Sequence, residues 1–214
     1  LHMLQSAMAQ FAQEPTVQGE KVTVLFEMTL HNLRDSGEIN EQDFLDRVDI
    51  LGTVGGELSE NYHVMVSNYA EYYRLAAYLL RYTEEPIGVA MGVPTLKELF
   101  EEKYYAELDG GILESFGRMF KNDLRLYVYP TGGQGGNIVN ARNLKVPDHL
   151  QGLFEYLLGN GFIRRIEDYR EDYLSIFSRD ALEKIRSGDD NWKTMVPEGV
   201  MKLIKERDLF GHKA

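Results

Sequence analysis

The chain has 214 residues, a formal net charge of −11 at pH 7 and no cysteine. Its length suits one large domain, or one domain with a smaller appendage, and 43% hydrophobic with 27% charged residues is typical of a globular protein. This composition excludes disulfides, cysteine nucleophiles and cysteine-ligated metal sites, and it excludes the uniformly basic surface that marks many nucleic-acid-binding proteins.

The first 19 residues are expected to lie outside the main domain. Leu1-His2-Met3 looks like a cloning remnant, and the polar segment after it, with one short helix, is a lead-in broken by Pro15 and Gly19. No apolar run of the sequence is long enough to cross a bilayer. We therefore expect a cytoplasmic protein that has neither a membrane nor nucleic acid as a partner.

Four short apolar runs predict buried β-strands: residues 22–26, 63–66, 87–93 and 124–129. Amphipathic helical patterns separate them. The first helix is expected to begin after Asn40 and to end at the glycines Gly52, Gly55 and Gly56. Such alternation is typical of a parallel sheet covered by helices. We predict an α/β fold, with a Rossmann-like three-layer domain and a mainly parallel sheet over residues 20–130.

The rest of the chain is expected to form two further segments. Residues 131–146 include Gly132, Gly133, Gly135 and Gly136, which predict a Gly-rich linker loop. Residues 147–214 show helical patterns, including an apolar face over 150–158, a helix capped by Ser178 and a last helix over 200–204. These patterns predict a helical C-terminal module.

Candidate ligand-binding residues follow the ends of the first two strands, where open α/β sheets bind ligands. Glu27 and Thr29 follow the first strand, and Ser67 and Asn68 follow the second. Ser67 and Asn68 either cap the next helix or mark a helix start whose backbone amides hold an anion.

A second group of candidates lies in a charged segment beside Gly110-Gly111, whose paired glycines permit close backbone approach to a ligand. Lys103 and Glu114 are the candidates there. Glu114 either contacts the ligand or pairs with Arg118 one helical turn away.

Motifs for a metal or a phosphate loop are missing from the sequence. It contains neither a GxxxxGK[ST] loop, nor a GxGxxG turn after a strand, nor an HxGH signature, and its five histidines are scattered. We predict no metal ligands, although the many carboxylates leave a Mg²⁺ cofactor open. The catalytic residues stay unassigned.

Residues 24–30 resemble the first motif of haloacid-dehalogenase-like phosphotransferases, in which a strand ends in DxDxTL. Glu27 and Thr29 match in type, Ser67 falls at the second motif, and Lys103 is a candidate for the third-motif lysine. Leu25 stands at the position of the aspartyl nucleophile. Because leucine cannot act as a nucleophile, the resemblance implies a degenerate scaffold.

Segments spread over nearly the whole chain also resemble the C-terminal half of a group of longer, uncharacterised bacterial proteins. The segments are residues 11–15, 67–72, 102–105, 110–120, 126–130, 195–197 and 209–211. Members carry the label nicotinate- or nicotinamide-mononucleotide adenylyltransferase. The resemblance implies that an N-terminal half supplies part of any site, while the HxGH signature of such enzymes is absent here.

Three functional hypotheses follow. The first is a bacterial α/β domain that binds a nucleotide or another phosphorylated small molecule. The second is a non-catalytic assembly or regulatory module on a degenerate phosphotransferase-like scaffold, with a second copy of the chain or the N-terminal half as its partner. The third is an active mononucleotide adenylyltransferase. Whether the chain is an enzyme stays open.

Overall fold

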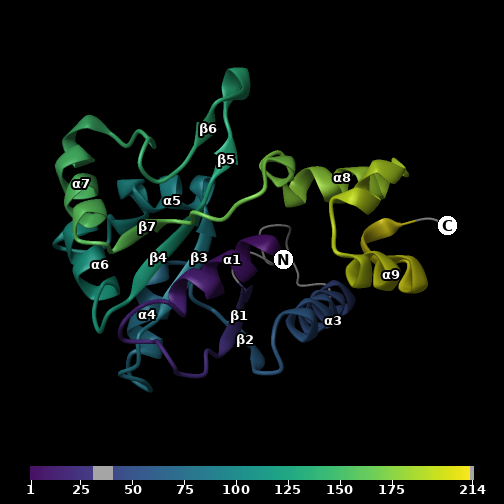
Figure 1. Cartoon of the computed structure of the whole chain (residues 1–214), viewed down its shortest axis with the longest axis horizontal. Coiled ribbons are helices and arrows are strands. Elements are labelled where there is room, and N and C mark those ends of the chain that lie inside the picture. The colour runs from purple at the N-terminus through teal and green to yellow at the C-terminus, as the bar shows by residue number, and fades with distance from the viewer. Residues whose placement is uncertain (31–40, 213–214) are drawn as a thin grey trace. The chain divides into compact units, whose positions relative to one another are not determined.

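A computed structural model (Figure 1) describes residues 1–30 and 41–212. The fold is mixed α/β, with 51% helix, 14% strand and small parallel sheets, which confirms the predicted fold class at this level. The chain divides into two units. Unit 1 comprises residues 21–69 and 175–214 together with Leu1, and unit 2 comprises residues 2–20 and 70–174. The boundaries predicted at residues 20, 131 and 147 stay predictions.

Unit 2 is built on a three-stranded parallel sheet with the order β3-β4-β7. The strands are β3 (Gly88–Gly92), β4 (Arg125–Tyr129) and β7 (Ile163–Arg165). The strands expected over 87–93 and 124–129 are confirmed. The expectation of helices alone after residue 147 is wrong, because β7 pairs with β4 through Leu126 and Ile163.

Helices cover both faces of this sheet. They are α1 (His2–Phe11), α4 (Tyr72–Leu79), α5 (Val93–Leu99), α6 (Gly111–Met119) and α7 (Gln151–Gly159). Along β4, Leu126 and Val128 join one buried cluster with α4 to α7, while Tyr127 and Tyr129 join another with α1. Figure 1 shows α1 lying across β3 and β4. This alternation is what a strand buried on both faces requires.

A small hairpin occupies part of the segment expected to be a linker loop. Its strands β5 (Thr131–Gly132) and β6 (Ile138–Val139) pair antiparallel. Gly135 adopts a φ of +70°, a conformation that glycine reaches at little cost, and this allows the chain to reverse. Four 3₁₀ turns complete unit 2: η1 (Glu102–Tyr105), η2 (Gln134–Gly136), η3 (Asp148–Leu150) and η4 (Glu171–Tyr173).

Unit 1 contains a two-stranded parallel sheet, β1 (Val24–Thr29) and β2 (Tyr62–Ser67). The strand expected over 63–66 is confirmed, whereas the one expected over 22–26 starts later and runs on to Thr29. The four predicted strands thus pair in two separate sheets. A single Rossmann-like sheet over residues 20–130 is not confirmed.

Helix α3 (Glu41–Leu58) packs beside β2 and is longer than expected. The prediction that Gly52, Gly55 and Gly56 end it is wrong, since all three lie inside the helix. Gly55 is there because a Cβ atom at this position would come within 2.3 Å of the Tyr62 ring. Close packing, and not termination, accounts for this glycine.

The C-terminal part of unit 1 forms α8 (Ser178–Ser187) and α9 (Glu198–Arg207), with the turns η5 (Asp190–Thr194) and η6 (Leu209–Gly211). Trp192, Ile185 and Ile204 are buried together, and Ile50 and Val54 of α3 pack against them. The expected cap at Ser178 is wrong, because Phe177 holds the cap position and makes no side-chain cap bond.

Candidate functional site

The carboxyl ends of β1 and β2 bring together three of the predicted site residues. Thr29 is in register with Ser67, and Glu27 lies two residues back on the same face of the sheet. The Ser67 hydroxyl donates to Oε1 of Glu27 at 2.5 Å and accepts from the backbone N–H of Tyr69 at 3.1 Å. Burial raises the pKa of Glu27, and the hydrogen bond from Ser67 opposes this rise.

No helix starts at Ser67 and Asn68. The two predictions for these residues, a helix cap and a helix start whose backbone amides hold an anion, are therefore both wrong. Helix α4 begins at Tyr72, with Glu71 at its cap position. The Ser67 hydroxyl instead closes a turn with the N–H of Tyr69, a common use of serine after a strand. An anion site made of helix N-terminal amides is therefore absent at this point.

The other two predicted site residues, Lys103 and Glu114, belong to unit 2 and have local partners. Lys103 is exposed and pairs with Glu101. Glu114 accepts from the backbone N–H of Gly110 at 2.9 Å and pairs with Arg118. The alternative of a helix-surface pair is thus confirmed for Glu114, which also satisfies a backbone donor at the start of α6.

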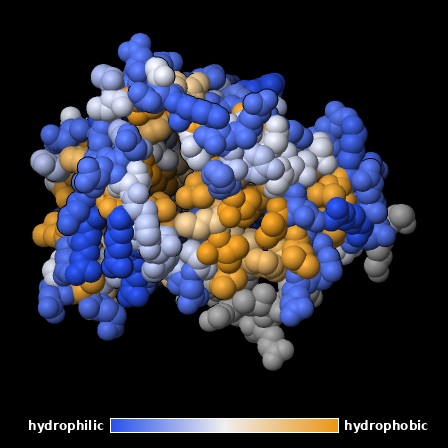
Figure 2. All heavy atoms as spheres, turned by 90° about the horizontal axis from the view of Figure 1, so that it is seen from below, coloured by the Kyte–Doolittle hydropathy of each residue, from blue (hydrophilic) through white to orange (hydrophobic). Residues whose placement is uncertain are grey.

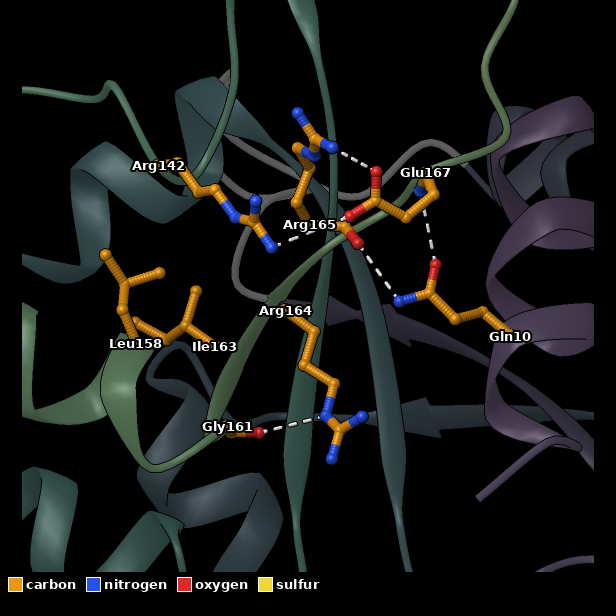
Figure 3. A pocket seen from close by; sticks show the side chains of 8 residues that line it. All are labelled: Gln10, Arg142, Leu158, Gly161, Ile163, Arg164, Arg165 and Glu167. Atoms are coloured by element: carbon orange, nitrogen blue, oxygen red, sulfur yellow. Dashed lines mark hydrogen bonds and ion pairs between the residues drawn. The ribbon is translucent and has the colours of Figure 1, made fainter.

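A pocket of about 270 Å³ lies along β7 in unit 2 (Figure 3). Among the described strands β7 pairs with β4 alone, and the three residues of β7, Ile163, Arg164 and Arg165, all line the pocket. The lining side chains come from α1, from the segment after β6, from the end of α7 and from β7 with its flanks. They are Gln10, Arg142, Leu158, Gly161, Ile163, Arg164, Arg165 and Glu167.

Arg164 is held in place by a buried carboxylate. Its Nη1 lies 2.6 Å from Oε1 of Glu14, whose side chain is only 5% exposed, and its Nε donates to the carbonyl of Gly161 at 3.2 Å. Glu14 also accepts from the Tyr127 hydroxyl at 2.9 Å and pairs with Arg125. This network fixes the Arg164 guanidinium and neutralises part of its charge.

Arg165 retains an unused donor. One of its terminal nitrogens pairs with Glu167, but its Nε is buried and has no hydrogen-bond partner. A buried N–H without a partner costs about 1–3 kcal/mol, and because this Nε has almost no accessible area, a ligand oxygen in the pocket does not reach it in this conformation. Figure 3 shows the Arg165 and Arg142 side chains near Glu167, and Nη2 of Arg142 lies 3.9 Å from Oε1 of that carboxylate.

Gln10 of α1 sets the position of these groups. Its amide donates to the carbonyl of Arg165 at 3.0 Å and accepts from the N–H of Glu167 at 3.2 Å. The backbone on both sides of Ile166 is thereby tied to α1. Arg165 and Glu167 consequently leave β7 from a fixed stretch of backbone.

The pocket is a local concentration of positive charge in an acidic chain. Three arginines and one glutamate line it, a formal sum of 3 − 1 = +2, whereas the whole chain carries −11. Guanidinium groups bind phosphate and carboxylate oxygens through paired N–H donors. Within residues 1–30 and 41–212, no group of three or more His, Cys, Asp or Glu side chains is placed to hold a metal ion.

No protein-family model, curated protein or solved structure matches the chain. None of the described helices is both long and apolar enough to cross a membrane. The arginine pocket was not predicted from the sequence. The apolar residues Phe162, Ile163 and Ile166, which follow Gly161, are a signal that could have located the strand β7, but they do not indicate a pocket.

Proposed function

We propose that the chain binds a phosphorylated small molecule, such as a nucleotide, in the pocket along β7. The observation that supports this most is the set of three arginines, Arg142, Arg164 and Arg165, that line one cavity. A cavity of about 270 Å³ suits a phosphate group and a small part of the molecule that carries it. The whole chain carries a net charge of −11, so it does not attract anions in general. The cluster of arginines is therefore a local feature of the pocket.

Several finer statements belong to this proposal. The Rossmann-like, three-layer character of the domain, a cytoplasmic location and a bacterial origin stay predictions. So does separate ligand binding within unit 1, at Glu27, Thr29 and Ser67. No adenylyltransferase chemistry is proposed for the pocket.

Calorimetric titration with NMN, ATP and glucose 6-phosphate tests the proposal. Arg165→Gln is expected to weaken binding of whichever compound binds by about 10- to 150-fold, because a hydrogen bond to a charged group is worth about 1.5–3 kcal/mol. Arg142→Gln, at a side chain that is 70% exposed, removes a donor without disturbing the fold. Arg118→Gln is the matched control, since Arg118 lies in the same unit and outside the pocket. The proposal fails if all three compounds leave the wild type silent at millimolar concentration, or if both pocket variants bind as the wild type does.

Assembly is the second candidate function, and exposed apolar side chains favour it. Figure 2 shows hydrophobic residues reaching the surface of one face between hydrophilic ones. In unit 1 the large hydrophobic side chains that are exposed include Leu25, Leu45, Val66 and Phe177. Leu25 and Val66 lie on opposite faces of the β1-β2 sheet, so these side chains do not form a single patch, but exposed apolar side chains are common at interfaces with other chains. Sedimentation velocity that shows a concentration-dependent oligomer would support this candidate, and a monomer at all concentrations would exclude self-assembly.

A further inference from the structure

We propose that the arginine pocket selects phosphate esters whose carbon part is apolar, and that Leu158 is the residue that sets this specificity. The inference rests on the proposed function and names the class of phosphorylated molecule that the site prefers. Alkyl and aryl phosphates belong to this class, and a nucleotide belongs to it through its base. A simple sugar phosphate, which presents hydroxyl groups beside the phosphate, does not.

One side of the pocket is apolar. Leu158, at the end of α7, and Gly161 and Ile163, which follow it, line this side, and we call these three residues the apolar wall. In Figure 3 the Leu158 and Ile163 side chains lie on one side of the pocket and Gln10 lies on the other. Ile163 is only 2% exposed, whereas Leu158 and Gly161 are partly exposed. A ligand therefore meets the apolar wall chiefly at Leu158 and Gly161.

The polar backbone groups of this wall are already used inside the protein. The N–H of Gly161 donates to the carbonyl of Leu158 at 3.1 Å, and the carbonyl of Gly161 accepts from Nε of Arg164 at 3.2 Å. A ligand hydroxyl that packs against the wall therefore gives up its hydrogen bonds to water without gaining equal ones, which is unfavourable. A methylene or aromatic carbon in the same place gains free energy, because its burial removes apolar surface from water.

The arginines attract the phosphate but do not distinguish between its esters. Arg142 is the most accessible of the three, since its side chain is 70% exposed and its Nη2 lies 3.9 Å from Oε1 of Glu167, beyond hydrogen-bonding distance. In a cavity of about 270 Å³, the carbon atoms that follow a phosphate bound at Arg142 have the apolar wall within reach. Two monoesters of equal charge gain equally from the arginines, so a difference in their affinities comes from the wall.

The test compares propyl phosphate with glycerol 1-phosphate, which has the same three-carbon chain and two added hydroxyl groups. At pH 7.5 both are largely dianions, because the second ionisation of a phosphate monoester lies near pH 6. Each is titrated into the full chain, and the amide signal of Gly161 is followed by NMR. For the wild type we expect propyl phosphate to bind about 10-fold more tightly, a ratio equal to about 1.4 kcal/mol and within the cost of burying one unpartnered hydroxyl.

Two variants of Leu158 are expected to reduce this preference in different ways. Leu158→Asn offers an amide to the hydroxyls, so the ratio is expected to fall to about 3-fold or less. Leu158→Ala removes apolar contact without adding a polar group, so it is expected to weaken propyl phosphate more than glycerol 1-phosphate. It also provides a measurement if the asparagine variant does not fold.

Leu153→Asn is the matched control. Leu153 lies on the same helix and packs against the same buried cluster as Leu158, but it does not line the pocket. This variant is expected to keep the wild-type ratio. Arg142→Gln is expected to weaken both probes equally and thus also to keep the ratio.

The outcomes separate this inference from the proposed function. If the wild type binds both probes equally, or if the folded Leu158 variants keep the wild-type ratio, the selection is overturned while phosphate binding stands. If neither probe shifts the Gly161 signal of the wild type at millimolar concentration, the proposed function fails, and the selection by Leu158 fails with it.

Discussion

Replacing Glu14 by alanine probes the buried ionic network that ties the segment after α1 to β4 and β7. The Glu14 carboxylate holds Arg125 and Arg164 and accepts from the Tyr127 hydroxyl at 2.9 Å, while only 5% of its own side chain is exposed. Removing one partner of a buried ion pair costs about 3–5 kcal/mol, because the other partner keeps its desolvation cost. The two arginines are partly exposed, which places the expected loss near the lower end, at about 3 kcal/mol.

A loss of this size is measurable by thermal unfolding. For a chain of this length each kcal/mol shifts the melting temperature by about 2–4 °C, so unit 2 is expected to melt about 6–12 °C lower. Hydrogen exchange of the β4 amides assigns the change to unit 2. Glu14→Gln keeps an oxygen for Tyr127 and is expected to fall between alanine and the wild type. Glu20→Ala, at an exposed carboxylate of the same segment, is the control and is expected to change stability by less than about 0.5 kcal/mol. A loss below about 1 kcal/mol for Glu14→Ala would refute the reasoning, since the network would then add no more than a surface ion pair does.

Two further predictions concern unit 1. Gly55→Ala is expected to destabilise the folded protein by about 1–3 kcal/mol, because the new Cβ atom meets the Tyr62 ring at 2.3 Å. Gly56→Ala, which places its Cβ atom in open space on the same helix, is expected to stabilise the protein by about 0.4–1 kcal/mol. Urea denaturation measures both changes, and changes of the same sign would contradict this prediction. Ser67→Ala is expected to raise the pKa of Glu27 further, because it removes the hydrogen bond that opposes the effect of burial. Because the pKa of Glu27 is raised in the folded state, protonation of Glu27 stabilises the folded protein at acid pH. This stabilisation is lost as the pH rises through the folded-state pKa. In the variant, whose pKa is higher, the stabilisation is lost at a higher pH. A carboxyl NMR titration of both proteins measures the shift, and an unchanged or lowered pKa would contradict the prediction.

Much of the secondary structure follows from hydrophobic patterns along the chain. The strands β2, β3 and β4 lie where continuous apolar runs predict them, and α6 and α7 follow apolar faces at helical spacing. Pairing of the strands is a different matter, because it depends on contacts distant in the sequence. The apolar pattern of residues 24–29 and 88–92 is alike, yet the two segments belong to different sheets.

The candidate site was predictable in part only. Glu27 and Ser67 meet because parallel strands in register place their carboxyl ends together. The arginine pocket is lined by residues of α1, of the segment that follows β6, and of β7, and these three parts lie far apart in the sequence. An arginine in a polar stretch usually lies in water, and nothing local distinguishes Arg142 or Arg165 from such a residue. Only the fold shows that one guanidinium is left with a buried nitrogen.

Unit 1 is formed by two segments that lie far apart in the sequence, and this has a consequence for its folding during synthesis. Residues 21–69 leave the ribosome well before residues 175–214, whereas every segment of unit 2 has been made by residue 174. At about 5–20 residues per second, the intervening stretch takes roughly 5–20 s to synthesise. During this interval Ile50 and Val54 of α3 lack the later-made side chains, Trp192 and Ile204 among them, that cover them in the finished protein. The first half of unit 1 therefore waits, with apolar surface uncovered, while unit 2 can already fold.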